Sequence, residues 1–312
     1  MDDLPQARRQ APSRGRPHQA AAYAAIDGLA FGDAFGERFF SLFRPEAEAR
    51  RLIAERTAPP DPHWHWTDDT AMALDLLAVL EAHGEVRSRA LAEQFAARYQ
   101  ADPGRGYGPG MHALLPRVAA APDEWQALAT ALFGGEGSFG NGAAMRVAPL
   151  GAWFHDDLDR AAEQAARSAA VTHAHPQGVA GAVAVAVAAA LSARGEAPAP
   201  AAVAARTPDG AVRQGLLRAA ELPPDTDPAA AAETLGSGRR VRADDTVPYA
   251  LWCAARHPDD LESALWATAA GLGDVDTTCA IAGGVVAART GTDALPDAWA
   301  QRREALPLWA LG

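Results

Sequence analysis

Apolar residues along this chain recur at the three- and four-residue spacing of helices, whereas alternating runs of β-branched residues are scarce. The pattern predicts an all-α fold in which many helices pack through glycine- and alanine-rich faces around one core. The predicted helices span residues 19–30, 71–80, 89–99, 111–118, 157–170, 178–192, 249–256, 262–271 and 279–288. Because composition does not shift sharply, we expect a single domain over 18–312 after a disordered tail over 1–17, which is rich in Arg, Pro and Gln.

The first predicted helix leads into glycines at four-residue spacing, Gly28, Gly32 and Gly36. This spacing makes a smooth helix face that another backbone can approach closely. Asp33 lies among these glycines. In a structural role it would bond neighbouring backbone groups, and in a functional role it would orient metal ligands without touching the metal itself.

Two acidic segments stand where predicted helices begin, Thr67-Asp68-Asp69-Thr70 and Asp274-Val275-Asp276-Thr277. Helix N-termini favour carboxylates and hydroxyl caps, so capping explains a single segment of this kind. Two of them can face each other and enclose divalent cations with oxygen ligands alone. Such ligands select Mg²⁺, Mn²⁺ or Ca²⁺ over zinc or copper.

A third segment, Asp244-Asp245-Thr246, also precedes an apolar helix, and Pro248 follows it. Proline fits the first turn of a helix, which makes Asp245 or Thr246 a candidate N-cap. We therefore assign this copy to structure rather than to metal binding.

The most glycine-dense region is 134–146, which contains Ser138 and Asn141 as side-chain donors. Successive N–H groups in such a loop can form an anion-binding nest. The loop lacks the spacing and the lysine of a nucleoside-triphosphate loop and follows no predicted strand, so it fits a diphosphate cradle better. The glycine-rich segment 105–110 either passes close to a ligand or simply connects two helices.

His173 and His175 are the remaining candidates for chemistry. Two histidines at this spacing can ligate zinc, but no third His or Cys accompanies them. We expect His173 to act as a hydrogen-bonding residue of a pocket.

Composition narrows the range of partners. The 28 basic residues are all Arg, and the net charge of −11 argues against a general nucleic-acid surface. Cys253 and Cys279 lie in apolar helical patterns and indicate small buried residues in a reducing compartment. No apolar run, including 179–191, is long enough to predict a membrane span, so we expect a cytoplasmic location.

Several motifs occur in the order seen in the ADP-ribosylglycohydrolase family, which includes the dinitrogenase-reductase-activating glycohydrolases. The resemblance spans about residues 25–291. It rests on Gly32-Asp33-Ala34, Trp66-Thr67-Asp68-Asp69-Thr70, Arg105-Gly106-Tyr107-Gly108, Gly140-Asn141-Gly142-Ala143-Ala144-Met145-Arg146, Thr172-His173 and Gly273-Asp274-Val275-Asp276-Thr277.

The resemblance implies a compact orthogonal bundle of helices with two Mg²⁺ or Mn²⁺ ions, which removes ADP-ribose from a modified target. The metal ligands it implies are Thr67, Asp68, Asp69, Asp274, Asp276 and Thr277, with Asp68 and Asp69 as the catalytic carboxylates. The substrate-binding residues it implies are Tyr107, Ser138, Phe139, Gly140, Asn141, Gly142 and His173. We expect a monomer whose partner is an ADP-ribosylated substrate.

This chain departs from the family pattern at two places. Leu272 precedes Gly273-Asp274 where members often have glycine, which should alter packing more than ligation. Some members carry a glutamate at the position of Phe40, and the nearby Glu37 does not align with it. An inactive ADP-ribose-binding or structural protein, like the lens-protein relatives of the family, is the alternative to a hydrolase.

Overall fold

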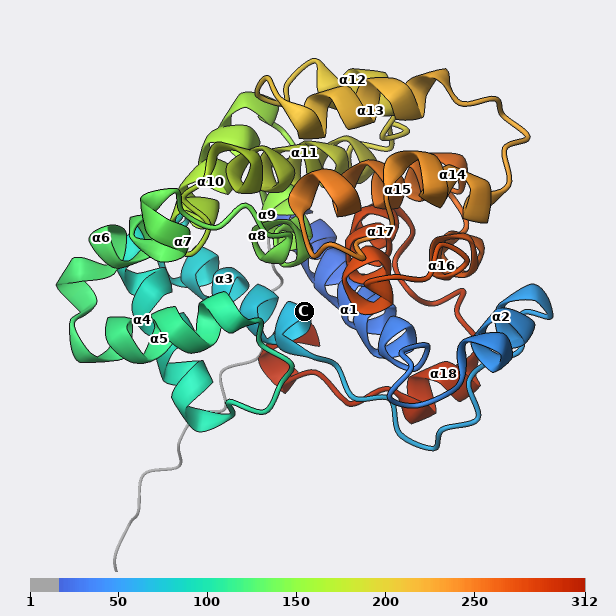
Figure 1. Ribbon diagram of the computed structural model, residues 1–312, viewed down its shortest axis with the longest axis horizontal. Coiled ribbons are helices and arrows are strands. Elements are labelled where there is room, and N and C mark those ends of the chain that lie inside the picture. The colour runs from blue at the N-terminus through green and yellow to red at the C-terminus, as the bar shows by residue number, and fades with distance from the viewer. Residues whose placement is uncertain (1–16, 312) are drawn as a thin grey trace, which may run out of the picture.

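Helices make up the regular structure of this protein in a computed structural model that describes residues 17–311 (Figure 1). The α-helices are α1 (Pro17–Glu37), α2 (Glu46–Ala54), α3 (Asp68–His83), α4 (Ser88–Ala101), α5 (Pro109–Ala120), α6 (Trp125–Thr130), α7 (Leu132–Gly135), α8 (Gly142–Met145), α9 (Ala148–Trp153), α10 (Leu158–Ala170), α11 (Pro176–Ala193), α12 (Pro200–Ala204), α13 (Ala211–Glu221), α14 (Pro228–Leu235), α15 (Ala243–Arg256), α16 (Leu261–Ala269), α17 (Val275–Thr290) and α18 (Asp297–Arg302). Two 3-10 helices, η1 (Pro122–Glu124) and η2 (Leu308–Leu311), complete the set for this range.

The predicted all-α fold is confirmed. Across residues 17–311 strand-type pairing is limited to two isolated bridges, Trp64 with Arg303 and Gly140 with Arg242. The predicted disordered tail over 1–17 lies outside the described residues, apart from Pro17, where α1 begins.

Helices α1 and α17 lie side by side in the middle of the molecule, in contact through the predicted glycine face (Figure 1). A Cβ atom on Gly32 would stand 2.0 Å from the carbonyl oxygen of Cys279, and one on Gly36 would stand 2.4 Å from that of Val275. The two backbones are therefore closer than any side chain allows. Because α17 begins at Val275, this contact brings the second acidic segment against the end of α1.

The glycines belong to a helix that is longer than the sequence pattern predicts. Helix α1 continues past residue 30 to Glu37, so Asp33 is a helical residue rather than part of a loop. Packing against α17 compensates for the low helix propensity of the glycines.

Helix α11 fills the core behind the site. Its 18 residues are long and apolar enough to cross a membrane by length and composition, which the sequence pattern did not indicate, but 78% of that window is buried inside the protein. This burial is typical of the central helix of an all-α core. Gly151 of α9 and Ala186 of α11 meet so closely that a Cβ on the glycine would lie 2.1 Å from the Ala186 carbonyl oxygen.

The capping role predicted for Asp245 and Thr246 is wrong. Helix α15 begins at Ala243 after Arg242, and neither side chain caps it. Pro248 stands inside the helix, beyond its first turn. Asp245 instead accepts hydrogen bonds from the backbone N–H and the guanidinium of Arg240, at 2.8 Å for Nη2. The segment is structural, as expected, but it stabilises the preceding loop.

Candidate active site

A cavity of about 380 Å³ opens where the N-termini of α3 and α17 meet the glycine-rich loop before α8. The predicted residues that line it are Asp68, Asp69, Ser138, Phe139, Gly140, Asn141, Gly142, His173, Asp274, Asp276 and Thr277. Both acidic segments and the predicted diphosphate loop thus border one space. Thr67 and Tyr107 are the two predicted site residues outside this lining.

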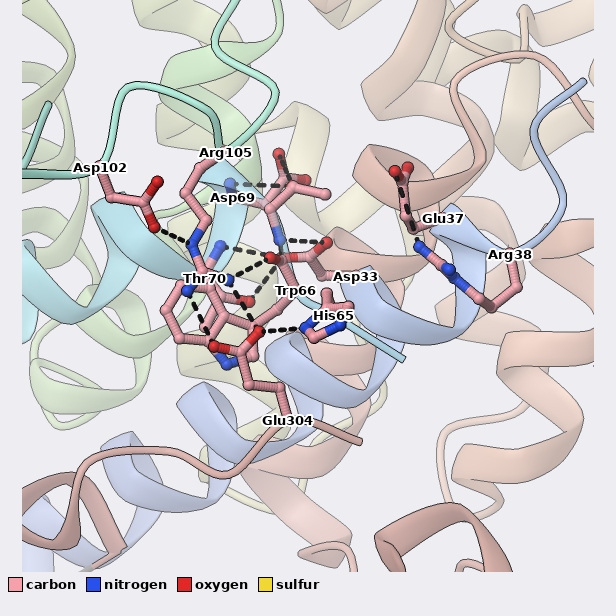
Figure 2. A network of polar contacts seen from close by, with 11 residues as sticks. Asp33, Glu37, Arg38, His65, Trp66, Asp69, Thr70, Asp102, Arg105 and Glu304 are labelled. Atoms are coloured by element: carbon pink, nitrogen blue, oxygen red, sulfur yellow. Dashed lines mark hydrogen bonds and ion pairs between the residues drawn. The ribbon is translucent and has the colours of Figure 1, made fainter. Parts of the chain in front are cut away.

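The carboxylate of Asp33 holds the start of α3 in place (Figure 2). Its carboxylate accepts from the N–H of Thr67 at 2.9 Å, from the N–H of Thr70 at 3.1 Å and from the Thr70 hydroxyl at 2.6 Å. Thr67 is the N-cap of α3 and accepts from the N–H of Asp69 at 3.3 Å. Asp33 and Thr67 therefore satisfy the N–H groups in the first turn of α3, so the carboxylates of Asp68 and Asp69 are not needed to cap the helix.

The carboxylates around the cavity repel one another. Burial, together with the charge of Asp33, raises the pKa of Asp68 to about 8. Burial and the neighbouring Asp276 raise the pKa of Asp69 well above its ordinary value, and burial and Asp274 do the same for Asp276. Such groups ionise together only when a positive charge lies among them.

Asp69 also has a buried oxygen, Oδ2, for which the described residues offer no hydrogen-bond partner. An unpaired buried carboxylate oxygen is costly and calls for a cation or another donor. In residues 17–311, no three His, Cys, Asp or Glu side chains are gathered into a ready metal cluster. The acidic side chains thus border the cavity with the right donor chemistry for a hard cation, without forming a closed coordination shell.

The raised pKa values of these carboxylates should make the thermal stability of the protein depend on pH. The pKa of Asp68 rises from 3.8 to about 8 on folding, so the folded chain holds a proton that the unfolded chain releases between these values. The stability of metal-free protein should therefore fall as pH rises from 5 to 8. Saturating Mg²⁺ should restore about 2–3 kcal/mol at pH 8, and much less at pH 5, because protons compete for the same oxygens.

Calorimetric melting with EDTA and with Mg²⁺ at both pH values measures this difference. Asp276→Asn should reduce both the pH dependence and the Mg²⁺ effect. Equal Mg²⁺ shifts at the two pH values would contradict the assignment of these carboxylates.

The glycine-rich loop is shaped by space rather than by backbone conformation. Positive φ angles occur at Gly134, Gly135 and Gly137, but not at Gly140 or Gly142, where the loop borders the cavity. The N–H groups that border the cavity are therefore not gathered by positive φ at Gly140 or Gly142. A Cβ on Gly142 would instead stand 2.8 Å from Cε1 of His173, and one on Gly140 would stand 3.3 Å from its Nε2.

His173 is held as a neutral ring. The buried Arg146 donates to the Thr172 hydroxyl at 2.9 Å, and this hydroxyl lies 2.7 Å from His173 Nδ1. Burial first, and then the charge of Arg146, lowers the pKa of His173 to about 3. Because the hydroxyl accepts from Arg146 and has its own proton for Nδ1, we infer that the ring proton is on Nε2, which faces Gly140 and Gly142.

Asn141 contacts an acidic residue rather than open space. Its amide nitrogen donates to Oδ2 of Asp274 at 2.7 Å and to the Thr246 hydroxyl at 3.0 Å. Thr246 belongs to the third acidic segment, so this segment helps to orient the Asn141 amide in the site. No local pattern predicts this contact, because it joins residues far apart in the chain.

Tyr107 points away from the cavity that its neighbours Gly106 and Gly108 line. Its ring packs edge-on against Tyr99, with 5.1 Å between ring centroids, and its buried hydroxyl has no hydrogen-bond partner among residues 17–311. Thr67 lies just beside the cavity, since a Cβ on Gly106 would be 3.7 Å from the Thr67 Cβ.

Arg105 connects the C-terminal segment to the start of α3 (Figure 2). Its guanidinium donates to both oxygens of Glu304, at 2.7 and 2.8 Å, and to the carbonyl of Trp66 at 3.0 Å, while its own carbonyl accepts from the N–H of Asp68 at 2.7 Å. Glu304 in turn donates its N–H to the carbonyl of Trp64. The acidic start of α3 is thus fixed from both sides, by Asp33 and by Arg105.

Comparison with known proteins identifies the family of this chain. The family model of ADP-ribosylglycohydrolases matches residues 15–311. The chain belongs to the ADP-ribosylglycohydrolase family. It is 31% identical to ADP-ribosylhydrolase ARH3 of Homo sapiens over 283 residues, covering 77% of this chain and 75% of that protein, and 30% identical to the protein of the same name from Mus musculus. A solved structure, an ADP-ribosylglycohydrolase-related protein complex, matches 92% of this chain with a TM-score of 0.60 at 24% identity, which supports the shared fold.

The position at which some ADP-ribosylglycohydrolases carry a glutamate is occupied here by Phe40, which lines a neighbouring pocket with Asp274. Glu37 does not line the main cavity and lies 3.8 Å from the guanidinium of Arg38 (Figure 2). Burial raises the pKa of Glu37 to about 7.

Sequence reasoning missed several residues that line the cavity. They are Met72, Met111, Phe133, Met145, Arg240, Val241 and Arg242. The run of arginines before the third acidic segment was the available signal, since it stands out in a chain with a net charge of −11.

Proposed function

We propose that this protein is a metal-dependent ADP-ribosyl hydrolase, which cleaves the bond between the distal ribose of ADP-ribose and a modified target. The observation that carries the proposal is the meeting of two acidic helix N-termini and a glycine-rich loop around one cavity. Family membership supports the reaction class, and the names of the ARH3 relatives support ADP-ribosylated substrates.

Thr67, Asp68, Asp69, Asp274, Asp276 and Thr277 are the residues that would hold two Mg²⁺ or Mn²⁺ ions. All six offer oxygen donors, which suit hard cations, and the unpartnered Oδ2 of Asp69 fits a ligand role. Bound cations would supply positive charge that grips the ribose hydroxyls and acidifies the attacking water.

The carboxylates of α3 have the proton chemistry that hydrolysis needs. Water adds its oxygen to the anomeric carbon, the bond from that carbon to the target breaks, and the water gives up a proton. We assign Asp68 or Asp69 as the acceptor of this proton, since the ordinary role of a paired carboxylate at such a site is general base. The proton then passes to the departing group of the target. Positive charge that develops on the ribose ring is stabilised by the surrounding carboxylates.

The loop of Ser138 to Gly142 is suited to the diphosphate. Ser138 Oγ accepts from the N–H of Gly140 at 3.2 Å, so its own hydroxyl proton remains for an anion, and the Nε2 proton of His173 faces Gly140 and Gly142. Small residues let an anion approach these donors closely.

The direct test is a panel of substrates with Arg-, Ser- and nucleobase-linked ADP-ribose, together with O-acetyl-ADP-ribose, assayed with Mg²⁺ for release of ADP-ribose. We expect at least one linkage to be cleaved. Binding of ADP-ribose without any release would favour the inactive binding protein instead.

Replacing Gly140 with Val should weaken ADP binding by about 10-fold or more at saturating Mg²⁺. The side chain would crowd His173 Nε2 and Ser138 Oγ, each 3.3 Å from the position of the new Cβ, and take the space of the phosphates. Calorimetric titration of ADP measures this loss. Gly104→Val, in an exposed turn where the Cβ meets only Asp102, is the matched control and should bind normally. Undiminished ADP binding by a folded Gly140→Val protein would contradict the loop assignment.

A further inference from the structure

The loop between α14 and α15 carries Arg239, Arg240 and Arg242, and the last two line one edge of the active-site cavity. We call residues 236–242 the arginine loop. At one end, the carbonyl of Ser237 accepts from the N–H of Asp274 at 3.0 Å. At the other end, the guanidinium of Arg242 lies 5.1 Å from the centre of the Phe139 ring. The loop therefore runs from the acidic end of the cavity to the glycine-rich end.

A second groove adjoins the cavity behind the acidic end of this loop. Four arginines line it, Arg50, Arg218, Arg239 and Arg240, and we call it the arginine groove. Arg240 lines both the groove and the cavity, so the two spaces lie on either side of one residue. Apolar side chains of the groove come from Ala229, Ala232, Leu235 and Ala270.

Two of the four arginines have no carboxylate partner. Arg50 pairs with Glu46 at 2.7 Å, and Arg240 pairs with Asp245 at 2.8 Å. Arg218 and Arg239 are exposed and make no ion pair or hydrogen bond with any side chain of residues 17–311. In an acidic chain, this leaves two guanidinium groups in the arginine groove that are available to an external anion.

The position of the groove identifies which part of a substrate meets it. The diphosphate and the target are attached to opposite sides of the distal ribose, and the glycine-rich loop is suited to the diphosphate. Ser237 lines the arginine groove, and its carbonyl accepts from the N–H of Asp274, one of the residues proposed to surround the distal ribose. We therefore place a target that is attached to this ribose next to the groove.

We propose that the arginine groove binds acidic residues of a protein target next to its ADP-ribosylated side chain, an inference that rests on the proposed hydrolase function. A guanidinium pairs well with a carboxylate, and the apolar residues of the groove suit a peptide backbone and its side chains. Glu233, Asp244 and Asp245 also line the groove and would repel the regularly spaced phosphates of a nucleic-acid backbone, whereas a peptide can place its carboxylates at the arginines alone. Because exposed ion pairs are weak, the groove would change the preference among targets by a few-fold rather than supply most of the binding energy.

The test compares two peptides that carry the same ADP-ribosyl linkage, chosen from the linkages cleaved in the substrate panel. One peptide has Asp and Glu around the modified residue, and the other has Ser and Gln. Wild-type protein should favour the acidic peptide by about 5-fold in kcat/KM at low salt, and 0.5 M NaCl should remove the preference. The double variant Arg218→Gln/Arg239→Gln should cleave both peptides equally, at the wild-type rate for the neutral one.

The matched control is Arg167→Gln on α10, which removes an exposed arginine that lines none of these cavities and pairs with Glu163. It should keep the full preference. If the double variant also keeps the preference, or if an ADP-ribosylated oligonucleotide gains more from the two arginines than the acidic peptide does, the proposal is overturned.

A binding measurement separates this proposal from the proposed function. Fluorescence anisotropy of both peptides on an Asp69→Asn background, with and without the two arginine substitutions, reports the groove without turnover. A preference that depends on the arginines supports the groove even where no linkage is cleaved. Equal binding of both peptides overturns it even where hydrolysis is confirmed.

Discussion

Removal of divalent cations with EDTA should abolish release of ADP-ribose, and added Mg²⁺ or Mn²⁺ should restore it. The expected loss is complete because the carboxylates of Asp68, Asp69 and Asp276 are mutually repelling in the cavity, and no arginine or histidine donates a hydrogen bond to them within residues 17–311. Without cations, neither the ribose hydroxyls nor the attacking water has a positive partner. Initial rates measured after dialysis against EDTA and titration with each metal test this.

Zn²⁺ should restore activity poorly, because the proposed ligands are carboxylate and hydroxyl oxygens and include no sulfur or imidazole. The melting temperature in EDTA distinguishes loss of metal from loss of fold, since the protein should remain folded at pH 6. Full turnover in EDTA would refute the metal-dependent mechanism while leaving the family assignment intact.

Asp69→Asn should lower kcat/KM by more than about 100-fold. This loss would exceed the one expected from replacing a residue that only orients a metal ligand. Stability should be unchanged or higher, because the substitution removes a buried charge that Asp276, Asp33 and Asp68 all repel. Steady-state rates and denaturant unfolding of the same preparation give both quantities.

Asp245→Asn is the matched control, since it also changes a buried aspartate in the first turn of a helix. Asp245 accepts from Arg240, so its replacement should cost about 1 kcal/mol of stability and leave turnover within a few-fold of wild type. A large loss of turnover in Asp245→Asn with a mild effect in Asp69→Asn would mean that the third acidic segment, rather than the first, serves the reaction.

The contrast between these two aspartates shows where local sequence is sufficient. Asp69 and Asp245 both lie in an Asp-Asp-Thr sequence that comes before an apolar helix, and this local sequence alone predicts a helix N-cap in both segments. Thr67 does cap α3. Helix α15 begins at Ala243, three residues before the start that an N-cap at Asp245 would give, and Asp245 instead accepts hydrogen bonds from Arg240. The difference arises from the arginine loop, whose position depends on contacts with Asp274 and the glycine-rich loop.

The sequence by itself determined the helical class, the glycine face of α1 that another backbone can approach, and the two acidic helix starts. These features follow from short-range periodicity, from glycines at four-residue spacing and from the preference of helix N-termini for carboxylates. Each depends on residues within a few positions of one another, so the sequence alone predicts it.

Only the tertiary structure decided which side chains share the cavity. Asn141 turns its amide to Asp274, Tyr107 turns its ring to Tyr99, and Arg240 reaches the rim from a loop a hundred residues beyond the glycines. The direction of a side chain in a loop depends on the neighbours that packing brings to it, and those neighbours are remote in sequence. The sequence therefore predicts the two acidic helix starts of the site, whereas only the tertiary structure shows that Arg240 and Arg242 line the same cavity.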